Sequence, residues 1–316
     1  MARKATNIAA SVRARLQNVA KEKQANFQRM LTRYALERLL FRLSVSPHKD
    51  RFVLKGAMLY AAWLEDPFRM TRDVDLLSFG DREAERLVGI FRDICVQEVE
   101  EDGLSFDAEQ IVAEPIRDDQ LYGGVRLRTS ARLGTAVIPI QIDVGFGDIV
   151  TPGPSELEYP VLLDQPAPRL NAYPRETVAA EKFEAMVALD LANSRMKDFY
   201  DLLAMSRLFA FEGAVLAAAI RATFERRGTS VPPERPPSLT AAFSDDPQKA
   251  QQWRSFLARE PLLIDEPDLP TVIREISDFI MPAAHGAIDG GHMPGRWSPD
   301  GGWNPRTRRR TSINNE

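Results

Sequence analysis

The sequence predicts an α+β protein, with a mixed β-sheet in its N-terminal part and helices in its C-terminal part. Apolar residues recur at helical spacing over residues 1–45, and period-two alternation typical of strands dominates from about 104 to 150. Helical periodicity then returns, after a proline-rich stretch that indicates a boundary. We therefore expect a domain over 1–150, a connector over 151–175, a helical domain over 176–284 and a tail rich in Gly, Pro and Arg over 285–316.

The N-terminal part is expected to begin with helices that Ser46-Pro47 ends. Short elements then alternate: a strand over 52–54, a helix over 58–64, a strand over 73–77 and a helix over 83–96. Leu133-Gly134 predicts a hairpin turn before an apolar strand over 136–144.

The C-terminal part is expected to consist of helices near 177–190, 195–210, 213–227, 247–259 and 270–281. From His285 onward the composition predicts a poorly ordered tail. Trp297 and Trp303 are unusual in a disordered tail, so docking of these side chains on the folded body stays an alternative.

The composition is that of an ordinary globular protein, with 44% hydrophobic and 27% charged residues. The net charge of −4 implies that a nucleic-acid partner would need a local basic patch. One cysteine, Cys95, and three histidines argue against disulfides and zinc, and favour a reducing compartment. No apolar run approaches the roughly 18 residues that span a bilayer. We therefore expect a cytoplasmic protein without membrane contact.

Three acidic residues form the most informative pattern. Asp73 and Asp75 flank Val74 in a strand, so both carboxylates project from one face. Asp143 interrupts another apolar strand, where a lone carboxylate is costly without a partner. If the two strands are neighbours, the three carboxylates converge and can hold Mg²⁺ or Mn²⁺ for phosphoryl transfer. The alternative for an isolated Asp-x-Asp is a pair of surface acids.

Basic and glycine residues precede the acids along the chain. Arg69 and Arg72, with Thr71 between them, can bind triphosphate oxygens, or the arginines can form ion pairs with nearby acids. Lys55-Gly56-Ala57 can present backbone N–H groups to phosphate, or it is only a turn.

Two features of the helical part are also candidates. Lys182 lies at the margin of an apolar stripe, where it either reaches into a cleft or extends its amine to solvent. Asp198 and Asp201 share one side of the next helix, which either contributes to a site or is a solvated face.

The stretch from about Leu31 to Phe256 resembles the AbiEii/MenT-type nucleotidyltransferase toxins of type IV toxin–antitoxin and abortive-infection systems. The matching blocks are Tyr34-Ala35-Leu36-Glu37-Arg38-Leu39-Leu40, Phe52-Val53-Leu54-Lys55-Gly56, Arg69-x-Thr71-x-Asp73-Val74-Asp75-Leu76-Leu77, Ile142-Asp143-Val144-Gly145-Phe146-Gly147-Asp148, Ala180-Glu181-Lys182 and Ser194-Arg195-Met196-Lys197-Asp198-Phe199-Tyr200-Asp201. One departure is Ala57, where the family usually has Gly or Ser.

The resemblance implies a nucleotidyltransferase-like N-terminal domain and a helical C-terminal domain. It implies that Asp73, Asp75 and Asp143 bind metal. It also places Lys182 and Asp198 in the active site, with Lys182 on the triphosphate. A cognate antitoxin is a further implied partner.

We therefore expect a Mg²⁺-dependent transfer of a nucleoside monophosphate from a nucleoside triphosphate to an RNA hydroxyl, such as one on tRNA, with release of pyrophosphate. In this hypothesis Asp73 and Asp75 bridge two metal ions, and Asp143 holds the ion that activates the attacking hydroxyl. The alternatives are transfer to a protein hydroxyl, and a catalytically silent nucleotide- or RNA-binding module. The arginines near the C-terminus, Arg306, Arg308, Arg309 and Arg310, either contact RNA phosphates or belong to a solvated tail.

Overall fold

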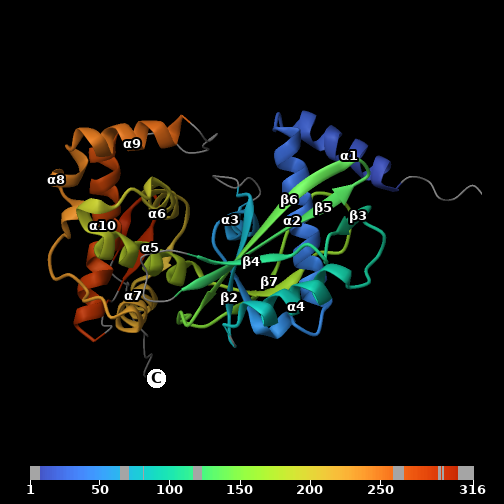
Figure 1. The fold of residues 1–316 in the computed structure, drawn as a ribbon. Coiled ribbons are helices and arrows are strands. Elements are labelled where there is room, and N and C mark those ends of the chain that lie inside the picture. Colours follow the sequence, from blue (N-terminus) through green and yellow to red (C-terminus); the bar gives the residue numbers. More distant parts are fainter. Residues whose placement is uncertain are drawn as a thin grey trace, which may run out of the picture. The chain divides into compact units, whose positions relative to one another are not determined.

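The chain folds into two compact units (Figure 1). The computed structural model describes residues 8–64, 71–80, 82–116, 123–258, 267–290, 293 and 295–304. The first unit, called the sheet unit, comprises Met1–Asp148 and Pro154–Tyr173. The second, called the helical unit, comprises Ile149–Gly153 and Pro174–Glu316. The predicted α+β class with a mixed sheet is confirmed.

A mixed sheet of eight strands, counted over the described residues, forms the centre of the sheet unit. Its order is β3-β5-β6-β2-β1-β8-β7, with β4 also paired to β5. The strands are β1 (Phe52–Lys55), β2 (Asp73–Ser78), β3 (Leu104–Phe106), β4 (Val112–Ile116), β5 (Gly124–Leu133), β6 (Ala136–Phe146), β7 (Ser155–Glu158) and β8 (Arg169–Ala172). Strand β2 runs parallel to β6, and β1 runs parallel to β8, whereas the other pairs are antiparallel.

The hairpin predicted at Leu133-Gly134 joins the two longest strands of this sheet. Leu133 pairs with Ala136, and Gly134 has a φ of +63°, a conformation that glycine adopts without steric cost. Along β6, from Ile138 to Phe146, buried residues alternate with residues that are exposed or partly exposed. One face of β6 therefore belongs to the core, and its other face carries Asp143.

Four α-helices belong to the described part of the sheet unit: α1 (Ile8–Glu22), α2 (Phe27–Val45), α3 (Met58–Trp63) and α4 (Ala84–Val96). Asn26 caps α2 by accepting from the backbone N–H of Arg29, and α2 ends at Val45, before the predicted Ser46-Pro47 break. Helix α2 packs on β6 and β8, with α1 and α4 beside it. Cys95, on α4, is buried in the core.

The proline-rich segment is not a separate connector, contrary to the prediction for residues 151–175. Strands β7 and β8 lie in this segment, and both join the sheet. The backbone N–H of Tyr173 also donates to the carbonyl of Leu54 at 2.9 Å. The prolines interrupt regular structure on either side of two short strands without excluding those strands from the sheet.

The helical unit is built mainly from α5 (Arg175–Leu189), α6 (Met196–Leu208), α7 (Gly213–Arg227), α8 (Ala241–Ser244), α9 (Pro247–Leu257) and α10 (Leu269–Ile288). Helices α5 and α7 pack together, and α10 packs on α6 and α7. None of the helices described in either unit is long and apolar enough to cross a membrane.

The predicted disorder from residue 285 is wrong for the described part of that segment. Helix α10 continues to Ile288, and β10 (Arg296–Ser298) and β11 (Gly302–Asn304) form a small sheet with β9 (Phe211–Glu212). The indole N–H of Trp297 donates to the carbonyl of Ser206, and that of Trp303 to the carbonyl of Phe279. Two tryptophans thus anchor this hairpin on the helical unit, as the docking alternative anticipated.

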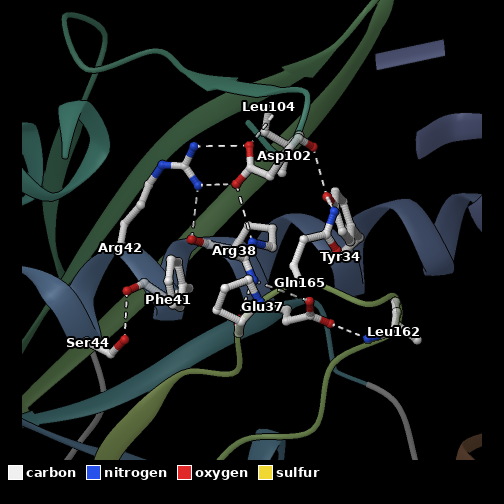
Figure 2. A network of polar contacts seen from close by, with 11 residues as sticks. Tyr34, Glu37, Arg38, Phe41, Arg42, Ser44, Asp102, Leu104, Leu162 and Gln165 are labelled. Carbon is white, nitrogen blue, oxygen red and sulfur yellow. Dashed lines mark hydrogen bonds and ion pairs between the residues drawn. The ribbon is translucent and has the colours of Figure 1, made fainter. Parts of the chain in front are cut away.

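A buried polar network ties α2 to two segments that are distant in the sequence (Figure 2). Arg38 and Arg42 both donate to the carboxylate of Asp102, at 3.3 Å from Arg38 Nε and 2.6 Å from Arg42 Nη1. Arg38 Nη1 also donates to the carbonyl of Pro166 at 2.8 Å, and the Tyr34 hydroxyl donates to the carbonyl of Asp102. Since the three charged side chains are almost fully buried, each depends on its partners for stability.

Glu37 is the fourth charged residue of this network. Its Oε2 accepts from the backbone N–H of Leu162 at 2.8 Å, and its side chain is fully buried. Burial raises the pKa of Glu37 to about 7, although the Leu162 N–H, Arg38 and Arg33 oppose the shift. Glu37 therefore titrates near neutral pH in the folded protein.

Replacing Glu37 by Gln should change how stability depends on pH. The folded pKa of about 7 lies above the ordinary value of 4.5 for a glutamate, so this group stabilises the fold at low pH and loses that contribution as pH rises through 7. The wild type should lose about 2 kcal/mol from this group between about pH 5.5 and pH 8, whereas Glu37→Gln should not. Urea denaturation at both pH values measures the difference. Glu109→Gln, at an exposed position, is the control; equal pH dependence in Glu37→Gln and wild type would contradict the assignment.

Candidate metal centre

Asp73, Asp75 and Asp143 meet on two neighbouring strands of the sheet. Strands β2 and β6 are parallel and paired, with Asp75 opposite Asp143 and Asp73 opposite Gln141. Val74, Ile142 and Val144 alternate with these residues and are buried. Because side chains alternate across a strand, the three carboxylates project from the same face of the sheet.

The three carboxylates are close enough to share a cation. One oxygen from each lies within 4.8 Å of the others, and all three residues are partly exposed. A set of carboxylate oxygens matches the preference of hard divalent ions such as Mg²⁺ and Mn²⁺, and three like charges at this separation favour a cation. The residues present therefore fit a divalent metal.

Neutral and cationic side chains orient two of the acids. The Thr71 hydroxyl donates to Asp73 Oδ1, and Gln141 Nε2 lies 3.5 Å from Asp143 Oδ2. Arg126 donates to Asp143 through Nε at 2.8 Å to Oδ1 and through Nη2 at 2.6 Å to Oδ2. The hydrogen bond to Asp143 raises the pKa of Arg126, so this side chain stays charged.

Arg126 is a site residue that the sequence analysis did not identify. In the pattern Val125-Arg126-Leu127-Arg128 it resembles an ordinary residue on the solvated side of a strand. The register of the hairpin that turns at Gly134 is the signal that identifies Arg126. Counting seven residues back from Leu133 and seven forward from its partner Ala136 (133 − 7 = 126 and 136 + 7 = 143) places Arg126 opposite Asp143.

The Lys-Gly turn lies directly against the triad. Gly56 follows β1 with a φ of +72°, and a Cβ atom built on it would lie 2.0 Å from Asp75 Oδ2. The Lys55 ammonium lies 2.9 Å from Asp148 Oδ2 and over the Tyr173 ring. Lys55 thus connects the ends of β1 and β6. A contact of Lys55, Gly56 or Ala57 with nucleotide stays a prediction.

Replacing Gly56 by Ala should disrupt the triad. The added methyl group would overlap the Asp75 carboxylate, and the positive φ is unfavourable for alanine. We expect at least about a tenfold weaker metal affinity because Asp75 must move, together with a loss of roughly 1 kcal/mol in stability. Mn²⁺ titration and thermal denaturation check both effects. Gly89→Ala on α4, where a Cβ meets no atom within 4 Å, is the control; unchanged Mn²⁺ affinity in Gly56→Ala would contradict this view of the turn.

Lys182, Asp198 and Asp201 form a second charged cluster, within the helical unit. The Lys182 ammonium lies 2.9 Å from Asp198 Oδ1 and 2.7 Å from Asp201 Oδ2, and Arg195 Nε lies 2.7 Å from Asp198 Oδ2. Both aspartates are buried, so neither the solvated-face alternative nor the solvent-directed lysine is correct. Burial alone would raise the pKa of Asp198, but Lys182 and Arg195 hold it below its usual value.

Only some of the remaining predicted residues lie in the described part of the chain. Arg72 is exposed just before β2, and Thr71 contacts Asp73. Arg69 and the tail arginines Arg306, Arg308, Arg309 and Arg310 lie outside the described residues. The structure therefore brings together the acidic triad and Thr71, adds Arg126, and places Lys182 with Asp198.

A mixed sheet that presents convergent carboxylates from adjacent strands is typical of enzymes that transfer phosphoryl or nucleotidyl groups with divalent metals. The sequence profile of the family described as "Nucleotidyl transferase AbiEii toxin, Type IV TA system" matches residues 38–275. The chain belongs to this family and is a nucleotidyltransferase. Membership implies a nucleotide substrate and an antitoxin partner.

Two solved structures from Helicobacter pylori are similar to this chain at 13% sequence identity. JHP933 has a TM-score of 0.49, and the match covers 84% of this chain and 96% of that one. A candidate nucleotidyltransferase has a TM-score of 0.48, with 85% of this chain and all of that one covered. No curated protein matches the chain significantly. The assignment therefore depends on the family match.

Proposed function

We propose that the chain transfers a nucleoside monophosphate from a nucleoside triphosphate to a hydroxyl group on RNA, with tRNA as the expected acceptor. The observation that carries this proposal is the convergence of Asp73, Asp75 and Asp143 within 4.8 Å on adjacent parallel strands. Such a site suits a reaction in which positioning and charge compensation supply most of the catalysis.

Asp73, Asp75 and Asp143 would hold Mg²⁺ or Mn²⁺, which when bound stabilises negative charge on phosphoryl oxygens. Thr71 supports this arrangement by donating to Asp73. This contact restricts the rotation of the Asp73 carboxylate and keeps its oxygens on the shared face of the sheet.

In the proposed reaction the acceptor oxygen forms a bond to the α-phosphorus as the bond from that phosphorus to the bridging oxygen of pyrophosphate breaks. The acceptor hydroxyl gives up its proton to solvent. Arg69, Arg72 and the Lys55-Gly56-Ala57 turn are our proposed contacts for the triphosphate. Lys182 and Asp198, on the helical unit, are proposed active-site residues on the basis of the family resemblance.

The proposed acceptor is tested with α-labelled triphosphates. The purified full chain is incubated with each of the four nucleotides and either total RNA or a protein extract, in the presence of Mg²⁺, Mn²⁺ or EDTA. Metal-dependent label in RNA, and specifically in tRNA after electrophoresis, is the expected result. Label in protein alone would overturn the RNA acceptor in favour of a protein hydroxyl. Nucleotide binding without transfer to either acceptor would overturn the catalytic proposal.

The proposal also includes a protein partner, the antitoxin, and a cellular compartment, the cytoplasm. A cognate antitoxin would restrain transfer while it is present, and the reaction would take place in the cytoplasm, where RNA and nucleotides are available. The single, buried Cys95 is compatible with a reducing environment.

A further inference from the structure

Arg126, on the neighbouring strand, binds both oxygens of the Asp143 carboxylate. Its Nε and Nη2 donate to different oxygens of Asp143, at 2.8 and 2.6 Å, which is the bidentate geometry of strong guanidinium–carboxylate pairs. The two residues are directly opposite each other on β5 and β6. Both side chains are mostly buried, with 29% and 15% of their surface exposed. The pair is therefore screened less by solvent than a surface ion pair.

This arrangement conflicts with the use of Asp143 as a metal ligand. A carboxylate that accepts two hydrogen bonds from a guanidinium has fewer lone pairs left for a cation. A second positive charge near the guanidinium also adds repulsion. When Asp143 becomes a metal ligand, its bond to Arg126 must therefore weaken or break.

A nucleoside triphosphate offers Arg126 a replacement partner. Phosphate oxygens match the planar fork of a guanidinium as carboxylate oxygens do. Arg126 projects from the same face of the sheet as the triad, because its register partner Asp143 does so. When Arg126 loses the negative charge of Asp143 as its partner, the phosphate of the substrate that arrives with the metal would replace it.

We propose that Arg126 exchanges partners during loading: its guanidinium holds Asp143 before loading and moves to a phosphate group of the nucleotide when Asp143 binds metal. This inference rests on the proposed function of the triad. Without nucleotide, Arg126 would compete with the metal ion for the Asp143 carboxylate. With nucleotide present, Arg126 would contribute to binding of the metal–nucleotide complex.

Arg128 provides a matched control on the same strand. It lies two residues from Arg126, on the same face of β5, opposite Gln141. Its ion pair is with Glu114, at 2.8 Å, and about half of its side chain is exposed. A change at Arg128 removes the same charge from the same strand without removing the bond to Asp143.

The test measures binding rather than turnover. Mn²⁺ binding to the full chain is followed by the loss of the free Mn²⁺ electron paramagnetic resonance signal, first without nucleotide. Binding of α,β-methylene nucleoside triphosphates is then measured at saturating Mn²⁺. For Arg126→Gln we expect Mn²⁺ alone to bind roughly tenfold more tightly and the nucleotide to bind roughly tenfold more weakly. Arg126→Lys should show smaller changes in the same directions, and Arg128→Gln should show neither.

The outcomes separate this inference from the proposed function. Absence of Mn²⁺ binding by the wild type would overturn the metal site itself. Wild-type binding with unchanged or weaker Mn²⁺ affinity in Arg126→Gln would overturn the exchange alone. Tighter Mn²⁺ binding with unchanged nucleotide affinity would also overturn it, because the guanidinium would then have no role on the phosphate. If Arg126→Gln does not fold, the same criteria are applied to Arg126→Lys.

Discussion

Replacement of Asp75 by Asn should reduce nucleotidyl transfer by about a thousandfold or more while the protein remains folded. Asp75 lies on β2 with Lys55 opposite it on β1 and Asp143 opposite it on β6. Loss of its charge removes metal-dependent stabilisation worth several kcal/mol, and each 1.36 kcal/mol is a factor of ten in rate. Asn preserves the shape of the side chain and lowers the repulsion among the acids, so the unfolding temperature should stay equal or rise. Single-turnover transfer and thermal denaturation measure the two effects.

The control for this experiment is a carboxylate of the same sheet that lies outside the triad. Glu158, on β7, is exposed and pairs with Arg169. Glu158→Gln should therefore leave both transfer and stability near their wild-type values. A folded Asp75→Asn protein with transfer within about tenfold of the wild type would contradict a metal role for Asp75.

Replacement of Asp102 by Ala should destabilise the protein by about 3–5 kcal/mol. Arg38 and Arg42 are almost fully buried and both donate to the Asp102 carboxylate (Figure 2). Without that carboxylate the two buried guanidinium groups would lose the counter-charge that they share, and breaking a buried ion pair in this way costs more than the net contribution of the pair itself. Because folded domains are stable by only about 5–15 kcal/mol, we expect a large loss of folded protein on mild heating. Urea denaturation followed by circular dichroism measures the change.

Two further variants isolate the cause of this loss. Asp102→Asn keeps a hydrogen-bond acceptor of the same shape, and it should cost less than Asp102→Ala. Glu101→Ala removes an exposed carboxylate from the neighbouring position, and it should change stability by less than about 0.5 kcal/mol. A loss below about 1 kcal/mol in Asp102→Ala would contradict the idea that the arginines depend on this residue.

The acidic triad was predictable because carboxylates in apolar strands are costly without a partner. Asp73, Asp75 and Asp143 all break such strands, and the structure places their oxygens together. The prediction assumed that β2 and β6 are adjacent, and the sequence did not establish that they are. The two strands are far apart in the sequence, and strand pairing over that distance is set by tertiary packing, which periodicity does not report.

The partners of the triad were harder to predict than its acids. Arg126 required the register of the β5–β6 hairpin, and Lys55 required knowledge that β1 ends near Asp148. An arginine or lysine at a strand end has the same local pattern whether it contacts solvent, a carboxylate or a ligand. Burial of Asp198 and Asp201 was likewise invisible, because two acids three residues apart are typical of an exposed helix face.

Amino-acid composition did not predict the ordered strands in the proline-rich segment over 151–175 or in the glycine-rich segment that follows residue 285. The hairpin of β10 and β11 is ordered because Trp297 and Trp303 pack with Phe279, at ring-centroid distances of 5.0 and 6.4 Å. A pair of aromatic side chains with a buried partner outweighs the flexibility of the surrounding glycines. The same limitation applied to residues 151–175, where two short strands satisfy backbone groups at the edge of an existing sheet.

The position of β8 has a consequence for the order in which this protein is completed during translation. Leu54 of β1 pairs with Ala172 of β8, so more than a hundred residues (172 − 54 = 118) separate the two partners. Until Ala172 has left the ribosome, one edge of β1 remains without its neighbour, and an open strand edge is prone to pair with other chains. The sheet that carries the acidic triad is therefore completed only after the chain has left the sheet unit at Asp148 and returned to it at Pro154.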